Sequence, residues 1–168
     1  MACSVTLSNY NLGDCFSSLG GIKTVWVANY VENAISATTS GETISSFASG
    51  ITWYKQDLRK NTGSMTSTLN VSENANYVST EALIEYTKMQ KESRIQMNAL
   101  AKGDLMLVVL DKNGAYYFLG EEEPVTASAG DGQTGQNRDD KNAYTITLTD
   151  SCSHFPRMLE DSAIAQLG

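Results

Sequence analysis

The stretch DLMLVVLDKNGAYYFLG, residues 104–120, decides the fold that the sequence predicts. Residues 105–110 are six apolar residues in succession, and a second apolar run, rich in aromatic side chains, covers residues 115–119. The pair Asn113-Gly114 lies between them, and because both residue types tolerate a positive φ, this pair is a strong signal for a β-hairpin. A strand that is apolar on both sides is usually covered on both faces. We therefore expect this hairpin at the centre of the fold, with a role in packing and none in chemistry.

The composition limits the classes of protein that fit the chain. Its 168 residues suit one domain that can bury a sizeable core. The net charge is −7 and no basic stripe is visible, which argues against tight electrostatic binding to a nucleic-acid backbone. Charged residues make up 18% of the chain, whereas Ser and Thr number 18 and 16. Such a hydroxyl-rich surface suits a protein covered by partners, and equally a plain β-sandwich.

The three cysteines, Cys3, Cys15 and Cys152, are odd in number and form no Cys-x-x-Cys motif. This pattern predicts free thiols in a reducing cytoplasm, and neither a disulfide framework nor a zinc site. The first twenty residues lack the basic and apolar regions of a secretory signal, so none is expected. No apolar run approaches the length of about 18 residues that a membrane span needs, so no membrane partner is expected either.

Alternating apolar and polar residues, rich in β-branched and aromatic types, indicate further strands. One helix is expected over residues 89–102, where good helix formers end at Lys102 and Gly103. The sequence therefore predicts a mainly β domain with one helix. The expected strands cover residues 22–30, 43–47, 51–58, 64–71, 77–88 and 143–149.

The remaining segments carry little periodicity. Residues 1–19 are expected to form an N-terminal arm, with at most a short strand at 4–7. Residues 121–142 are Gly-rich and polar in their middle and are expected to form a flexible loop. Beyond the single β-rich domain at 20–155, residues 156–168 are expected to be a C-terminal tail, either a short helix or a flexible arm.

Residues 64–88 predict a long two-stranded hairpin, because the polar SENAN at 72–76 separates two alternating runs. Two strands alone cannot bury one apolar face in water. The hairpin must therefore pack on its own sheet or on a neighbouring subunit, since an exposed one would favour aggregation. Its apolar face is the candidate subunit interface, made of Met65, Leu69, Val71, Val78, Ile84 and Tyr86.

The sequence contains three candidates for a chemical site, and for each of them a structural explanation fits better than a functional one. The GDGQTG motif at 130–135 satisfies G-x-G-x-x-G, but it lacks the preceding buried strand and the following helix of a dinucleotide site. The acidic clusters at 121–123 and 139–140 lack the ligand spacing of a calcium loop, so solvated acidic edges are expected. No cofactor and no metal is therefore predicted.

His154 is the single histidine, and Cys152 and Ser153 are next to it in the sequence. A Ser-His-acid or Cys-His arrangement is compatible with this spacing, since such groups assemble in space. Immediate neighbours on a strand point to opposite faces, however, and nothing else in the sequence supports catalysis. We therefore expect no enzymatic activity.

Four segments occur together in one order: GGIKTVWVANY (20–30), WYKQDLRKNTGSMTSTLN (53–70), ALAKGDLMLVVLDKNGAYYFLGEEE (99–123) and NAYTITLTD (142–150). This combination resembles a family of virion structural proteins from tailed phages of Bacteroidetes, crAss-like phages included. In that family the chain looks like a tail-tube subunit or a related ring protein of the head-to-tail connection. The resemblance covers most of residues 20–150, and none of its segments is a catalytic motif.

The resemblance implies a β-sandwich or half-barrel with one flanking helix. Subunits would form homo-oligomeric rings of six or twelve copies, located in the virion tail or connector and assembled in the host bacterial cytoplasm. They would contact neighbouring tail or connector proteins and enclose a channel through which DNA passes without specific binding. The acidity of the chain agrees with such a channel, because like charge disfavours phosphate contacts. The polar arms at 1–19 and 121–142 could bridge stacked rings.

Two alternatives stay open at this point. A stopper or terminator would be a different ring component, distinguished by its symmetry and position. A monomeric β-sandwich binding module of a host-attachment structure belongs to another class, and clustered exposed aromatic residues on a stable monomer would favour it.

Overall fold

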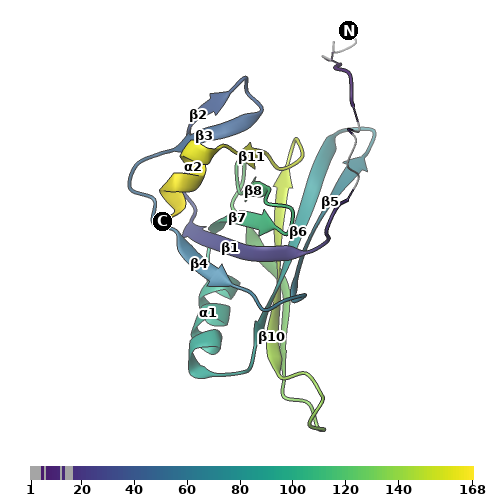
Figure 1. Ribbon diagram of the computed structural model, residues 1–168, viewed down its shortest axis with the longest axis vertical. Coiled ribbons are helices and arrows are strands. Elements are labelled where there is room, and N and C mark those ends of the chain that lie inside the picture. The colour runs from purple at the N-terminus through teal and green to yellow at the C-terminus, as the bar shows by residue number, and fades with distance from the viewer. Residues whose placement is uncertain (1–4, 6, 12, 14–16) are drawn as a thin grey trace.

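The computed structural model describes residues 5, 7–11, 13 and 17–168, and it is mainly β, with two sheets and one longer helix (Figure 1). Sheet A has seven strands in the order β2-β3-β11-β8-β7-β1-β4, and sheet B has four in the order β5-β6-β10-β9. Sheet A comprises β1 (Ile22–Asn29), β2 (Ile35–Thr39), β3 (Thr43–Phe47), β4 (Tyr54–Asp57), β7 (Leu105–Asp111), β8 (Tyr116–Leu119) and β11 (Met158–Leu159). Sheet B comprises β5 (Gly63–Val71), β6 (Asn76–Thr87), β9 (Thr126–Gln133) and β10 (Ala143–Cys152).

The predicted central hairpin is confirmed as β7 and β8. All six residues from Leu105 to Leu110 are buried, because β7 has apolar cores on both of its faces. The turn has three residues, with the Asp111 N–H donating to the Ala115 carbonyl and a positive φ of 90° at Gly114 alone. This glycine supplies the left-handed residue that a three-residue hairpin loop requires.

One core lies between the two sheets. It joins the side chains of Val25, Leu107 and Val109 from sheet A to those of Ile84 and Ile146 from sheet B. The helix predicted at 89–102 is confirmed as α1 (Lys91–Lys102). It closes one end of this core through the buried side chain of Leu100. The second core lies on the opposite face of sheet A, and the consequence is that β7 is sandwiched between the two.

The second core brings the end of the chain into the fold. Leu159 of β11, Ala163 of α2 (Asp161–Ile164) and Leu167 of η1 (Ala165–Leu167) are buried with Phe47 and Phe118. Figure 1 shows α2 beside β2 and β3. The short helix considered for residues 156–168 is confirmed as α2. Residues 158–167 are part of the folded core, however, so a separate tail was wrong. The two-residue strand at 158–159 is too short for any periodicity to reveal it.

The expectation of a flexible loop over residues 121–142 was wrong for the segment that forms β9. Thr126–Gln133 pairs antiparallel with β10 from Thr149 to Ala143. Glycine and aspartate are rare in strands, so the local sequence argues against this element. Tertiary packing explains it, because a Cβ atom at Gly132 would lie 2.7 Å from the Tyr144 ring and one at Gly130 would lie 3.3 Å from the Thr145 carbonyl oxygen.

The other predicted strands are close to those observed. The hairpin at 64–88 is confirmed as β5 and β6, with Met65 opposite Ala82 and Leu69 opposite Val78. The strand expected at 51–58 is shorter, and β2 was not predicted. The strand considered at 4–7 falls partly outside the described residues. The described residues before β1 are exposed and irregular up to Gly20, where Leu19 is bonded to the turn of the central hairpin.

Candidate functional site

The six residues of the predicted subunit interface do not lie on one surface. Val78 and Ile84 are 2% and 0% exposed within the core of this chain, so including them was wrong. Met65 and Tyr86 are half-buried against the same core, and the Tyr86 hydroxyl donates to Gln56 Oε1 over 2.9 Å. The apolar face of the hairpin is thus covered by the chain's own sheet A over most of its length.

The tip of the same hairpin remains uncovered. Leu69 and Val71 are 51% and 73% exposed, and Tyr77 on the paired strand is 45% exposed. Figure 1 shows β5 and β6 extending along one side of the molecule. The interface stays a prediction for Leu69 and Val71, the two residues of the predicted set whose side chains are largely exposed.

The face of sheet B that points away from sheet A, called the outer face here, is hydroxyl-rich. Because residues alternate along a strand, every second residue of each strand lies on this face. Cross-strand pairs such as Thr66 with Glu81 and Glu81 with Thr149 continue the polar surface over the sheet. Its members are Ser64, Thr66, Thr68, Asn70, Tyr77, Ser79, Glu81, Leu83, Glu85, Thr126, Ala129, Asp131, Thr145, Thr147, Thr149 and Ser151.

The charged residues in the strands of sheet B are all acidic. Its four strands contain no lysine and no arginine, whereas Glu81, Glu85 and Asp131 lie on the outer face. The nearest basic contact comes from outside the strands, where Lys141 Nζ lies 2.7 Å from Glu85 Oε2. A flat hydroxyl and carboxylate surface of this kind repels phosphate groups more than it binds them.

Among the described residues, no strand pairs with the outer edge of β5 or of β9, the two outer strands of sheet B. Neither contains proline or lysine, the residues that natural edge strands commonly use to prevent pairing with another chain. Each neighbouring pair in the sheet is antiparallel, so β5 and β9 run in opposite directions. The β9 edge of one copy could therefore pair antiparallel with the β5 edge of the next.

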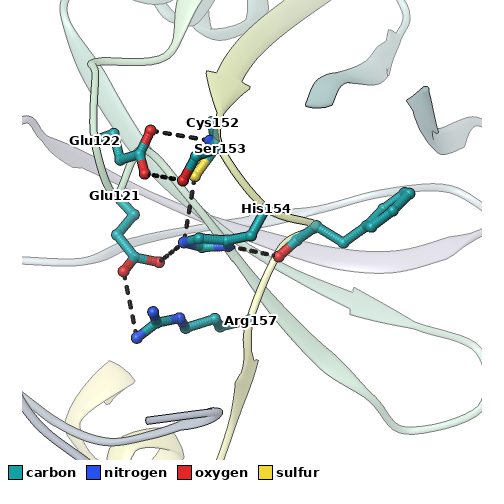
Figure 2. A network of polar contacts seen from close by, with 7 residues as sticks. Glu121, Glu122, Cys152, Ser153, His154 and Arg157 are labelled. Atoms are coloured by element: carbon teal, nitrogen blue, oxygen red, sulfur yellow. Dashed lines mark hydrogen bonds and ion pairs between the residues drawn. The ribbon is translucent and has the colours of Figure 1, made fainter. Parts of the chain in front are cut away.

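A polar cluster joins the turn after β8 to the segment after β10 (Figure 2). Gly120, with φ of 97°, turns the chain out of β8, and Glu121 and Glu122 follow it. Glu122 accepts hydrogen bonds from the backbone N–H of Ser153, over 2.9 Å, and from the Ser153 hydroxyl. The hydroxyl bond is the main cause of the lowered pKa of Glu122. Sequence reasoning missed this cluster, although Cys152 and His154 at a spacing of two residues could have indicated a shared side.

The His154 ring connects the members of the cluster. Its Nδ1 lies 2.8 Å from the carbonyl oxygen of Phe155, and because a carbonyl only accepts, Nδ1 carries a proton. Its Nε2 lies 3.5 Å from Cys152 Sγ and 3.4 Å from Glu121 Oε2, and Glu121 also contacts Arg157 (Figure 2). A thiol and a carboxylate therefore approach the same ring nitrogen.

This geometry differs from that of a nucleophile-His-acid triad. In a triad the nucleophile and the acid contact different ring nitrogens, so that one nitrogen takes the proton while the other is held by the acid. Burial also raises the pKa of the Cys152 thiol to about 11, which disfavours the reactive thiolate. Instead, the Cys152 thiol and the Glu121 carboxylate both lie close to His154 Nε2, and each of these three groups can ligate a metal ion.

Asp150 is an unusual buried acid next to this cluster. It is 4% exposed, lies on the same face of β10 as Cys152, and its Oδ1 has no hydrogen-bond partner. Burial raises the pKa of Asp150 to about 6, and the negative charges of Glu122 and Glu123 add to the shift. The end of β10 is thus a site of concentrated negative charge with few neutralising partners.

The glycines of the GDGQTG motif have structural roles. A Cβ at Gly130 would lie 3.3 Å from the Thr145 carbonyl and 3.6 Å from Met97 Cε of α1. Gly135 has a φ of 71° in the turn where Asp140 accepts hydrogen bonds from the N–H groups of residues 136 and 137. These contacts, rather than a nucleotide, explain the glycines, and Asp140 serves as a turn cap.

Comparison with protein families, with curated proteins and with solved structures found no match. Within the described part of the chain, no helix combines the length and apolarity needed to cross a lipid bilayer. The functional argument therefore depends on the chain's own surfaces.

Proposed function

We propose that this chain is a phage virion structural protein whose copies assemble into a ring that forms part of the tail tube or head-to-tail connector, a conduit for DNA. The observation that carries the proposal is sheet B, with two unprotected edges of opposite direction and no basic residue in any strand. The sequence resemblance to virion proteins supplies the biological setting.

Edge pairing would complete the backbone hydrogen bonds of sheet B. The N–H and C=O groups of a free edge are a template for another strand, and a closed barrel removes every edge. Because β5 and β9 run in opposite directions, each subunit would continue an all-antiparallel sheet around the ring. Joining β9 of one copy to β5 of the next repeats the same contact at each step, as cyclic symmetry requires.

The dimensions of such a barrel agree with a DNA channel. Six copies of the four-stranded sheet supply about 24 strands, and a spacing of about 4.8 Å gives a backbone diameter of about 37 Å. Strand tilt widens the barrel further. A bore of this width accommodates a DNA duplex after the side chains of the lining are placed, and a twelve-fold ring would be about twice as wide.

The outer face of sheet B would line the bore. Its short Ser and Thr side chains leave room, and Glu81, Glu85 and Asp131 repel the phosphate backbone. Non-specific affinity for DNA comes mainly from lysine and arginine contacts with phosphates. The strands of this face contain neither residue, and Lys141 at its margin is ion-paired with Glu85. A passing genome would therefore not adhere to the wall.

The proposal is tested by crosslinking between Thr66→Cys in β5 and Ala129→Cys in β9, both on the outer face. The full chain carries Cys3→Ser and Cys15→Ser, and a short bis-maleimide is added to the assembled protein. Edge pairing predicts a ladder of covalent oligomers up to the ring size when both cysteines are present. Each variant with only one of the two introduced cysteines is the matched control and should give no ladder beyond a dimer; the buried Cys152 is common to all of these variants.

Mass measurement by light scattering and negative-stain images of the same sample give the ring symmetry. A monomer at every concentration, with no ladder, would contradict the proposal and favour the binding-module alternative. If rings form but give no crosslinks between β5 and β9, the ring proposal stands and the edge contact between these two strands is excluded. The exposed aromatic residues of the described part of the chain come from four separate segments, at Tyr10, Tyr54, Tyr77 and Phe155.

A further inference from the structure

Three side chains of different metal-ligating types converge at the end of β10. One ligand atom each from Glu122, Cys152 and His154 lies within 4.8 Å of the other two. We propose that these three residues form a zinc site, with Cys152 Sγ, His154 Nε2 and a Glu122 carboxylate oxygen as ligands. This inference does not depend on ring assembly.

The separation of the Cys152 and His154 ligand atoms agrees with tetrahedral coordination. With Zn–S of about 2.3 Å and Zn–N or Zn–O of about 2.0 Å, a tetrahedral site places sulfur and nitrogen about 3.5 Å apart, and nitrogen and oxygen about 3.3 Å apart. Cys152 Sγ and His154 Nε2 are separated by 3.5 Å. Glu121 Oε2 lies 3.4 Å from the same nitrogen, which makes Glu121 the nearest further donor for the fourth position.

The surrounding hydrogen bonds orient the ligands as an outer shell does. Metal-bound histidines usually donate the other ring N–H to a carbonyl or carboxylate, and His154 Nδ1 does so to the Phe155 carbonyl. Nε2 is then the ring nitrogen that faces Cys152 Sγ and the Glu121 carboxylate. Ser153 holds the Glu122 carboxylate through its N–H and hydroxyl groups (Figure 2). The ligand positions are thus prepared without a metal.

The local charge favours a divalent cation. Glu121, Glu122 and a Cys152 thiolate would carry three negative charges around Zn²⁺, and Arg157, 3.4 Å from Glu121, balances the remaining one. Asp150 adds a further acid close to the cluster: it is 4% exposed, its Oδ1 has no hydrogen-bond partner, and it lies on the same face of β10 as Cys152. A nearby cation would offset the cost of this buried acid.

The donor types select zinc among the common cations. A thiolate and an imidazole suit Zn²⁺, whereas Ca²⁺ and Mg²⁺ prefer oxygen ligands alone. Binding would displace the thiol proton to solvent, since the thiolate is the ligand. The bound ion would fasten the turn after β8 to residues 152–154, where the chain leaves sheet B and crosses to β11 in sheet A.

The test uses the full chain without an affinity tag, stripped with a chelator, and carrying Cys3→Ser and Cys15→Ser so that no other thiol than Cys152 remains. Zinc content is measured by mass spectrometry after dialysis. Co²⁺ serves as the spectroscopic probe, because a thiolate ligand adds a charge-transfer band to its spectrum. We expect one Zn²⁺ per chain, and at a free concentration of 100 times Kd an increase of the folding equilibrium constant of about 100-fold.

Ligand variants and a charge-matched control separate coordination from general electrostatics. Cys152→Ser should abolish the charge-transfer band, and His154→Gln should weaken zinc binding by at least about 100-fold, beyond what outer-shell changes typically cost. Glu121→Gln tests the fourth position and should weaken binding less. Glu123→Gln removes the same charge from an exposed neighbour and should change affinity by no more than about two-fold, because solvent screens it.

The proposal is overturned if the chain with Cys152 as its single thiol binds less than one equivalent of zinc, or if Cys152→Ser retains the cobalt charge-transfer band. Circular dichroism of each variant shows whether it is folded. If Cys152→Ser does not fold, the zinc affinity of His154→Gln tests the site instead. His154 is only partly buried, so its replacement leaves no buried gap.

Discussion

The Cβ position of Gly132 lies 2.7 Å from the ring atoms of Tyr144, the residue paired with it across β9 and β10. A side chain at this position has no room unless the tyrosine ring moves. Gly132→Ala should therefore destabilise the protein by about 1–3 kcal/mol through overpacking. Chemical denaturation measures this, and Gly20→Ala, with open space at its Cβ and no positive φ, is the control expected to be near neutral.

Ile84 tests the corrected assignment of the hairpin face. Its side chain is fully buried between the sheets, so Ile84→Ala should cost about 2–4 kcal/mol of unfolding free energy in the single chain. The unfolding free energy is measured by chemical denaturation at a protein concentration too low for assembly. A loss that appeared only at assembling concentrations would instead restore Ile84 to the subunit interface.

The hairpin tip tests the part of the interface that stays a prediction. Leu69→Asp with Val71→Asp should leave the fold intact, since both side chains are largely exposed, but should weaken rings because a charge buried at a contact is costly. Ile95→Asp is the matched control, because Ile95 on α1 is exposed to the same degree, 50% against 51% for Leu69. Light scattering over a concentration series compares the variants; equal assembly by all of them would remove the tip from the interface.

Asp150 predicts a specific pH dependence of stability. Its folded pKa of about 6 is above the ordinary value of 3.8, so the folded state binds a proton more tightly than the unfolded state does. The stability contributed by the protonated form is full below pH 3.8 and is lost as the pH rises through about 6. Asp150→Asn should therefore be more stable than wild type above this range by up to about 3 kcal/mol.

Denaturation at several pH values, with chelator present so that no metal adds its own charge, measures the Asp150 difference. The two proteins should converge at the acid end, where wild-type Asp150 is protonated. A difference that is constant with pH would show that packing of the amide, and not ionisation, determines it.

Asn113 fixes the segment that precedes β1. Its Oδ1 accepts from the Leu19 N–H over 2.8 Å, and its Nδ2 donates to the Leu19 carbonyl over 2.9 Å. Asn113→Ala should release this segment and speed hydrogen exchange of the Leu19 amide by about 5- to 10-fold, with little effect on global unfolding. Lys112→Ala, which removes a different turn contact to Asn61, should leave the Leu19 amide protected.

The sequence was most informative where burial and periodicity agree. Val108 and Val109 lie in a run that is apolar on both faces, and the structure covers both. Periodicity could not reveal β9, because Gly130 and Gly132 are selected by side chains that come from α1 and β10. Nor could it reveal the cluster at the end of β10, since Glu122 and His154 are brought together by tertiary contacts between distant segments. The spacing of Cys152 and His154 was compatible with a shared side, but nothing in the sequence supported a site there.

The position of β11 has a consequence for the order in which the molecule can fold. Met158 and Leu159 lie between β3 and β8, so the β2–β3 hairpin joins sheet A through the last strand of the chain. During synthesis β2 and β3 emerge early, yet their place in the sheet exists only after residue 159 has left the ribosome. Docking of this hairpin is therefore a late, long-range step, and the Phe47 side chain stays accessible to solvent until it occurs.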